Sequence, residues 1–225
     1  MENIKVKNVI IGKQPENSEN YQKFKETVKN KKINVIIVEV KDTDDTRNRI
    51  DAKTIGSGID SSKNEISKIN QYVYNNILYI EKNLYFQILW PDTKNVISEN
   101  ALNNSSLVFK LNYINYSMLF MGDIEEVAEK QILKKYKNNL EILKADVLKI
   151  PHHGSNSSST KEFIEAVRPK IALIGVGENN KFGHPNEQVI ERLIDFGVQI
   201  YRTDKSGEIS INVNKNGRFT VRKFI

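Results

Sequence analysis

The segment Lys-Ile-Pro-His-His-Gly-Ser at residues 149–155 constrains the fold of this chain more than any other feature. It holds two of the three histidines in the chain, follows a run typical of a buried strand at 145–150, and precedes a serine-rich turn. Asp123 and His184 likewise follow hydrophobic runs typical of strands. Because α/β folds assemble active sites where strands end, the sequence predicts an α/β fold with an acid and imidazoles at one edge of a sheet.

Composition limits the class of protein. The chain has 225 residues, 39% of them hydrophobic, which suits a single globular domain over residues 1–225. It contains no cysteine, so disulfides and thiolate zinc sites are excluded. No apolar run approaches the length of a membrane span, and the first residues lack the apolar stretch of a signal peptide. We therefore expect a soluble chain, whose compartment and oligomeric state the sequence does not specify.

The charge balance is basic, with a net charge of +6 and a pI of about 9.2. Such a balance favours polyanionic partners, among which DNA is the candidate. The basic residues are interspersed with acids along the chain. Charge alone therefore does not separate nucleic-acid binding from an ordinary solvated surface.

Apolar periodicity predicts the order of the elements. The first forty residues have the pattern of a β-α-β unit, whose helix begins after the cap Ser18. A polar stretch at about 42–76 is predicted to be a surface insertion with a strand or two. The remainder is predicted to contain hairpins at 77–90 and 107–121, a loop at 91–106, a helix opened by Asp123, a strand at 146–150, a helix from Thr160, a strand at 170–176, a helix at 186–196 and closing strands at 198–225.

Asp123 has two possible roles. With Glu126 three residues further on, it matches a helix N-cap close to a capping box, and a helix that follows a strand needs such a cap. A carboxylate has a second oxygen, which can bind metal while the first accepts from backbone N–H groups. The spacing allows both roles together.

His152 and His153 form the centre of the predicted site. On an extended segment their side chains would point in opposite directions, so both could bind one metal only if the backbone turns, which Gly154 permits. We expect one imidazole to face a metal and the other to face substrate or a supporting carboxylate. A triad of Ser155, His153 and Asp123 is disfavoured, because the chain has no Gly-x-Ser-x-Gly elbow.

His184 lies between a glycine and a proline just before a predicted helix. Alone it is a histidine in a helix-entry turn, but together with the other two motifs it joins the predicted site. Ser155, Asn179 and Lys181 are the candidate substrate-binding residues, because a hydroxyl, an amide and a cation can hold a phosphate. The serine-rich turn has an alternative role as the N-terminal cap of the following helix.

The order of these motifs resembles the metallo-β-lactamase-like hydrolases, most closely the soluble C-terminal domain of the competence protein ComEC. The resemblance runs through 17–21, 79–91, 99–108, 121–125, 143–155, 168–177, 179–185 and 201–204. Its specific parts are the histidine-pair segment and the later Gly-His-Pro, in this order. The resemblance implies an α/β fold of four αββα layers, in which two β-sheets are flanked by helices.

The same resemblance implies roles for particular residues. Asp123 would match the metal-bridging aspartate and His153 the last metal ligand, while His152 and His184 would be catalytic residues close to the substrate. Members of the family use divalent metals, zinc or manganese, to activate water. The competence domain is proposed to act as a nuclease during DNA uptake, on the strand that is not imported, and its parent protein is attached to the membrane.

The chain departs from the family at its first metal-binding cluster, since it contains no His-x-His-x-Asp-His. We therefore expect the C-terminal two-thirds of such a domain, lacking its first strands, with weak or no metal binding and little activity. The chain is expected to be either truncated, which the start of its first strand favours, or a degenerate, non-catalytic relative. Two alternatives stay open: a non-catalytic DNA-binding or interaction module, and a hydrolase of a small phosphoester or lactone.

Overall fold

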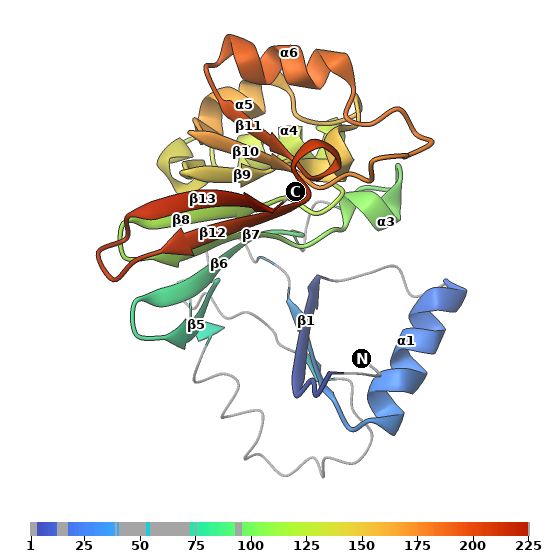
Figure 1. Cartoon of the computed structure of the whole chain (residues 1–225). Helices are drawn as coiled ribbons and strands as arrows, with labels where there is room; N and C mark the ends of the chain where they lie inside the picture. The colour runs from blue at the N-terminus through green and yellow to red at the C-terminus, as the bar shows by residue number, and fades with distance from the viewer. Residues whose placement is uncertain are drawn as a thin grey trace.

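The computed structural model describes residues 4–12, 18–38, 40, 53–54, 73–74, 76–92 and 96–224 (Figure 1). Its strands are β1 Asn8–Gly12, β2 Asn34–Val38, β3 Lys53–Thr54, β4 Val73–Tyr74, β5 Ile77–Glu81, β6 Leu84–Trp90, β7 Val108–Tyr113, β8 Tyr116–Phe120, β9 Val147–Lys149, β10 Ile171–Ile174, β11 Gln199–Arg202, β12 Glu208–Val213 and β13 Phe219–Phe224. Its helices are α1 Glu19–Asn30, α3 Ala101–Asn104, α4 Glu126–Lys135, α5 Lys161–Val167, α6 Glu187–Asp195 and α7 Thr203–Ser206, with 3-10 turns at Leu140–Leu143 and Pro151–Gly154.

One large sheet carries the candidate site. Its strand order is β11-β10-β9-β8-β7-β6-β5-β4. The neighbours β8, β9, β10 and β11 run parallel to one another, whereas β4 to β8 pair antiparallel. The carboxyl ends of the four parallel strands therefore lie along the same edge, where ligand sites of α/β sheets form.

The large sheet is covered on both faces. Along β8, Leu119 packs with the buried residues of α4, α5 and α6, while Met118 packs toward β12 and β13. The next parallel strand alternates in the same way, with Leu148 on the helical side and Val147 on the hairpin side. Figure 1 shows the three helices on one side of this sheet and the β12–β13 hairpin on the other.

A smaller sheet of order β1-β2-β3 supplies the rest of the second β layer. In β2, Ile36 and Val38 pack against residues of β5, β6 and β7, whereas Val35 and Ile37 pack against the α1 side. This alternation is the period of a strand buried on both faces. The layers are thus helices, large sheet, small sheet with hairpin, and α1, which confirms the α/β sandwich predicted from the sequence.

Several predicted elements are confirmed closely. The first unit is β-α-β with β1 and β2 parallel, and Ser18 caps α1 by accepting a hydrogen bond from the Tyr21 backbone N–H at 3.1 Å. Both predicted hairpins form, as β5–β6 and β7–β8. Thr160 caps α5, and Asn186 caps α6. Each cap satisfies an N–H group that has no partner within its own helix.

Two predictions are wrong, and most of a third lies outside the described residues. Asp123 does not open α4, because that helix begins at Glu126 after the N-cap residue Glu125. The stretch 91–106 was expected to be a loop, yet it contains α3. Within the polar insertion at 42–76, the structure describes β3, β4 and residue 76 alone, so the rest of that prediction lies outside the described residues.

Candidate active site

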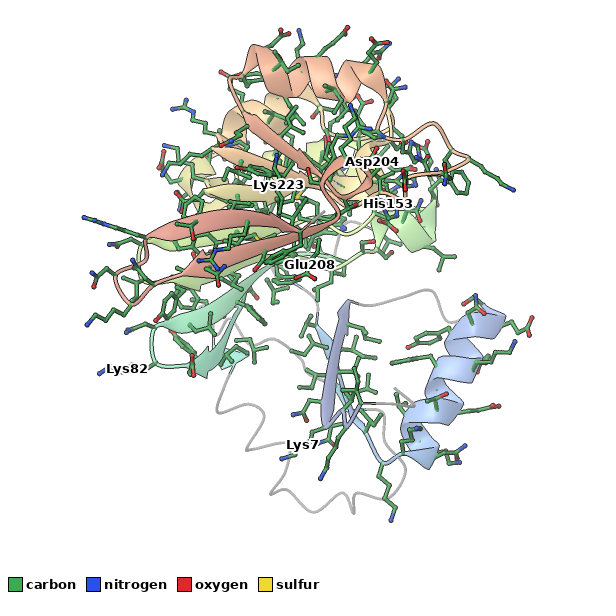
Figure 2. The ribbon with its side chains drawn as sticks, in the orientation of Figure 1. Lys7, Lys82, His153, Asp204, Glu208 and Lys223 are labelled. Atoms are coloured by element: carbon green, nitrogen blue, oxygen red, sulfur yellow. The ribbon has the colours of Figure 1, made fainter. Side chains whose placement is uncertain are left out.

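The three predicted motifs follow three adjacent parallel strands. Asp123 comes after β8, the pair His152 and His153 after β9, and His184 after β10. Backbone hydrogen bonds join the motifs: the His152 N–H donates to the Gly122 carbonyl at 3.1 Å, and the Asn186 N–H donates to the Gly154 carbonyl at 2.8 Å. Figure 2 shows His153 among the loops at this end of the sheet, far from Lys82 on the β5–β6 turn.

The histidine pair sits in a left-handed turn. His152 has φ 46° and ψ 40°, His153 has φ 56° and ψ 18°, and Gly154 continues with φ 83°. Consecutive non-glycine residues in this region are uncommon and cost about 1–3 kcal/mol each, and such strain concentrates at functional sites. The segment is therefore not extended, and its turn frees the two imidazoles from the alternation expected of a strand.

His153 has the tautomer of a metal ligand. Its Nδ1 lies 2.7 Å from the Gly175 carbonyl oxygen. A carbonyl accepts only, so Nδ1 carries a proton, and of the two neutral tautomers this contact selects the one whose lone pair is on Nε2. This is how ligating histidines are oriented in metal sites, where the ring nitrogen that does not bind metal donates to a carbonyl or carboxylate.

His152 faces a supporting carboxylate. Its Nδ1 lies 3.5 Å from Glu125 Oε1 and 3.5 Å from Ser157 Oγ. The other Glu125 oxygen accepts from Asn100 Nδ2 at 2.8 Å, and the Glu125 N–H donates to Asn104 Oδ1 at 2.9 Å. The α3 turn, which carries both asparagines at its ends, thus fixes Glu125 beneath the imidazole. The structure brings together the pair that the sequence predicted in general terms, an imidazole and its orienting acid.

His184 completes a cluster of imidazoles. Its ring centroid is 5.9 Å from that of His152, and its backbone N–H donates to Asn180 Oδ1 at 2.9 Å while its carbonyl accepts from Asn180 Nδ2 at 2.7 Å. Burial lowers the pKa of His184, and the proximity of the His152 and His153 imidazoles lowers it further, since a second positive charge beside either ring is unfavourable. The ring is therefore neutral at neutral pH and able to accept a proton.

Asp123 is free of the capping role. Its backbone N–H donates to Ser106 Oγ at 3.1 Å, while the N–H of Glu126, which opens α4, donates to the Ser157 carbonyl at 2.7 Å. The ammonium of Lys149 is the charged neighbour of Asp123: burial lowers the pKa of Lys149, and the Asp123 carboxylate opposes that shift. Lys149 also packs under the site, since its Cε lies 3.3 Å from the Cβ that a residue at Gly175 would carry.

A buried acid fixes the loop that follows the histidines. Glu129 is fully buried and accepts from the Ser159 N–H at 2.6 Å, the Thr160 N–H at 2.9 Å and Thr160 Oγ1 at 2.8 Å. Burial raises the pKa of Glu129, and these hydrogen bonds counteract the rise. From the other side, Arg192 donates to the Ser158 and Ser159 carbonyls at 3.1 and 2.9 Å. The serine-rich loop is thus anchored from α4 and from α6.

The candidate substrate-binding residues lie around the cluster with different roles. Ser155 Oγ lies 3.0 Å from Ser157 Oγ, so this hydroxyl supports the turn rather than His153. Asn179 and Lys181 are exposed in the loop before His184. The residue that shapes this loop is instead Asn180. Exposure leaves both Asn179 and Lys181 available to a substrate, so their predicted role in binding stays a prediction.

A divalent metal fits part of this site. Asp123 offers a carboxylate and His153 an unprotonated Nε2, which are suitable donors for zinc or manganese. Within the described part of the chain, no group of three or more His, Cys, Asp or Glu side chains could hold a metal ion. A complete shell of four to six ligands therefore needs donors besides these two.

Four contributors to the site were not singled out from the sequence: Glu125, Lys149, Asn180 and Phe182. Lys149 had a signal, because a lysine that ends a buried strand must place its ammonium somewhere polar. No sequence signal pointed to Glu125 or Asn180. Each is next to a residue of the same type, and only the path of the backbone decides which of the two side chains turns inward.

Gly154 couples two of the motifs sterically. A Cβ at this position would lie 2.6 Å from Pro185 Cβ and 3.1 Å from Pro185 Cα, at a φ of 83°. We expect Gly154→Ala to lower the free energy of unfolding by about 2–4 kcal/mol, from left-handed strain plus overpacking, and to displace His184. Chemical denaturation measures the loss. Gly177→Ala is the matched control, since a Cβ there meets nothing within 4 Å; equal effects of the two substitutions would contradict the coupling.

Comparison with known proteins identifies relatives of this chain. No family model matches it. It is 37% identical over 141 residues to ComE operon protein 3 of Bacillus subtilis, and 33% identical over 143 residues to competence protein ComA of Neisseria gonorrhoeae, with 62% of this chain covered in each case. The chain is a homologue of these bacterial competence proteins. It spans 17% and 20% of their respective lengths.

This homology to competence proteins confirms the relationship inferred from the histidine-pair and Gly-His-Pro motifs. A solved structure from Parabacteroides distasonis, described as a metal-dependent hydrolase, overlaps at a TM-score of 0.38 with 13% identity, covering 57% of this chain and 54% of that one. So loose an overlap carries no functional argument. Among the described helices of this competence-protein homologue, none has the length and apolar character needed to cross a membrane.

Proposed function

We propose that this chain forms part of a metal-dependent hydrolase that cleaves phosphodiester bonds in DNA, with its centre at Asp123 and the three histidines. The observation that carries the proposal is the His153 tautomer, in which the Gly175 carbonyl holds Nδ1 and leaves Nε2 open. The homology to competence proteins favours DNA as the substrate, and so does the net charge of +6.

Each residue of the centre has a distinct task in this proposal. Asp123 and His153 would hold a divalent metal together with further ligands, and the bound metal would supply hydroxide at neutral pH. The Lys149 amine lies beside Asp123, whose carboxylate opposes the lowering of the Lys149 pKa by burial and so favours its cationic form. A cation at this position favours the phosphate of a substrate over a neutral ester.

The remaining imidazoles would handle substrate and protons. Glu125 lies beside Nδ1 of His152, so Nε2 of His152 is the nitrogen left to meet a phosphate oxygen or the leaving group. His184 is neutral because its pKa is lowered, so its ring can accept a proton or a hydrogen bond from the substrate. The two rings are held at a centroid distance of 5.9 Å.

The direct test is cleavage of labelled single-stranded DNA with manganese or zinc, with and without EDTA. We run it on this chain and on the chain with the sequence that flanks it in its gene, because Asp123 and His153 alone do not complete a metal shell. Metal-dependent cleavage that EDTA stops is the expected result. Salt-dependent DNA binding that ignores EDTA, without cleavage in either form, would favour a non-catalytic binding module. Turnover of small phosphoesters or lactones without cleavage of DNA would show that the substrate is a small ester and not DNA.

A further inference from the structure

We propose that Phe182 is a stacking platform for an unpaired nucleobase beside the histidine cluster, which makes single-stranded DNA the substrate form that this site takes. The inference rests on the proposed function for the nature of the substrate. It assigns a binding role to a residue that the hydrolytic chemistry itself does not require.

The exposure and position of Phe182 set it apart from the other exposed aromatic residues that the structure describes. Its side chain is 82% exposed, compared with 53% for Phe224 and 41% for Phe196. Its ring is nearly parallel to that of His184, with an interplanar angle of 16° and a centroid distance of 6.0 Å. One face of Phe182 is thus turned toward a ring of the site, and the high exposure leaves the other open.

The loop that carries Phe182 is braced, so the exposure of the ring is built into the structure. Asn180 bonds both the N–H and the carbonyl of His184, and its own N–H donates to the Gly177 carbonyl at 3.2 Å. Gly183 takes a left-handed φ of 69° directly after Phe182. These contacts fix the backbone on both sides of Phe182 and so hold its exposed ring beside His184.

An unpaired base fits this ring best among polyanionic ligands. Base–aromatic stacking is tolerant of sequence because every base has a flat π face, and proteins that take single strands combine it with backbone cations. Lys181, exposed next to Phe182, can supply such a cation. Bases in a duplex are already stacked on both faces, so Phe182 discriminates in favour of single strands.

Binding measured in EDTA separates stacking from cleavage. We expect Phe182→Ala to weaken binding of a single-stranded oligonucleotide about tenfold, and to leave binding of an abasic oligonucleotide of the same length unchanged. Phe182→Trp should retain the affinity. Lys181→Ala should weaken both oligonucleotides and reduce the salt dependence by about one phosphate contact. Phe196→Ala is the control for an exposed phenylalanine, because Phe196 lies at the C-terminal end of α6 whereas the opposite end, at Asn186, contacts Gly154 of the site.

The outcomes distinguish this inference from the proposed function. Equal losses for intact and abasic oligonucleotides, or no loss for Phe182→Ala, overturn the stacking role. If DNA cleavage is lost in Asp123→Asn but unchanged in Phe182→Ala, the stacking role is overturned and the proposed function stands. Base-dependent binding through Phe182, in a protein that cleaves no DNA with its flanking sequence present, supports the stacking role and overturns the hydrolase.

Discussion

Asp123→Asn is expected to lower metal-dependent DNA cleavage by at least about 100-fold, because it removes the carboxylate charge at the centre while keeping its volume. The backbone hydrogen bond from Asp123 to Ser106 Oγ does not involve the carboxylate, and α4 starts after Glu125. The substitution should therefore leave the fold intact. Initial rates at saturating DNA and manganese measure the effect.

Asp195→Asn is the matched control for this experiment. Asp195 is an exposed carboxylate at the end of α6, so its loss removes one charge from the surface without touching the cluster. We expect rates within about twofold of the parent, as for surface substitutions in general. If both variants lose activity equally, the effect comes from net charge, and the central role of Asp123 fails.

Glu129→Ala is expected to destabilise the fold by about 3–5 kcal/mol, which is a large part of the stability of a typical domain. The substitution leaves the two N–H groups of Ser159 and Thr160 and the Thr160 hydroxyl without their shared acceptor, in a place where water does not reach Glu129. Urea denaturation followed by circular dichroism measures the loss. A melting temperature about 10 °C lower should accompany it.

Glu126→Ala is the control for Glu129→Ala, because it removes a carboxylate from an exposed position of the same helix. Glu126 is half exposed and forms an i,i+4 ion pair with Lys130 on the surface of α4. Pairs of this kind contribute about 0.3–0.5 kcal/mol. A loss below about 1 kcal/mol for Glu129→Ala, or an equal loss for both variants, would contradict the account of Glu129 as the acceptor that anchors the serine-rich loop.

The sequence predicts the strands and most helices because their signals are local. Ser18, Thr160 and Asn186 are caps whose side chains meet the next turn of the same chain. The gathering of Asp123 and the histidines could also be predicted, since parallel strands end at one edge. The helix starting at Glu126 could not, because Asp123 and Glu125 are both plausible caps and tertiary contacts decide between them.

The detail of the site depends on contacts between distant residues. No residue near His153 in the sequence predicts that its ring will meet the carbonyl of Gly175. Likewise, no residue near His152 predicts that the asparagines of α3 will hold Glu125. Gly154 indicates that the backbone can turn after the histidine pair, but it does not predict that His152 and His153 themselves are left-handed. Sequence patterns therefore predict which strand ends carry the candidate residues, whereas the orientation of the side chains and the partner of His153 required the fold.

A long-range proton–nitrogen NMR spectrum of the imidazoles, followed through a zinc titration, tests whether His153 and Asp123 bind a common metal ion. The chain has three histidines, so each can be assigned by substitution. The account predicts that His153 is protonated at Nδ1 and unprotonated at Nε2, and that zinc shifts its Nε2 resonance in the parent but much less in Asp123→Asn. A proton on Nε2 of His153, or no response of any imidazole to zinc, would contradict the metal centre.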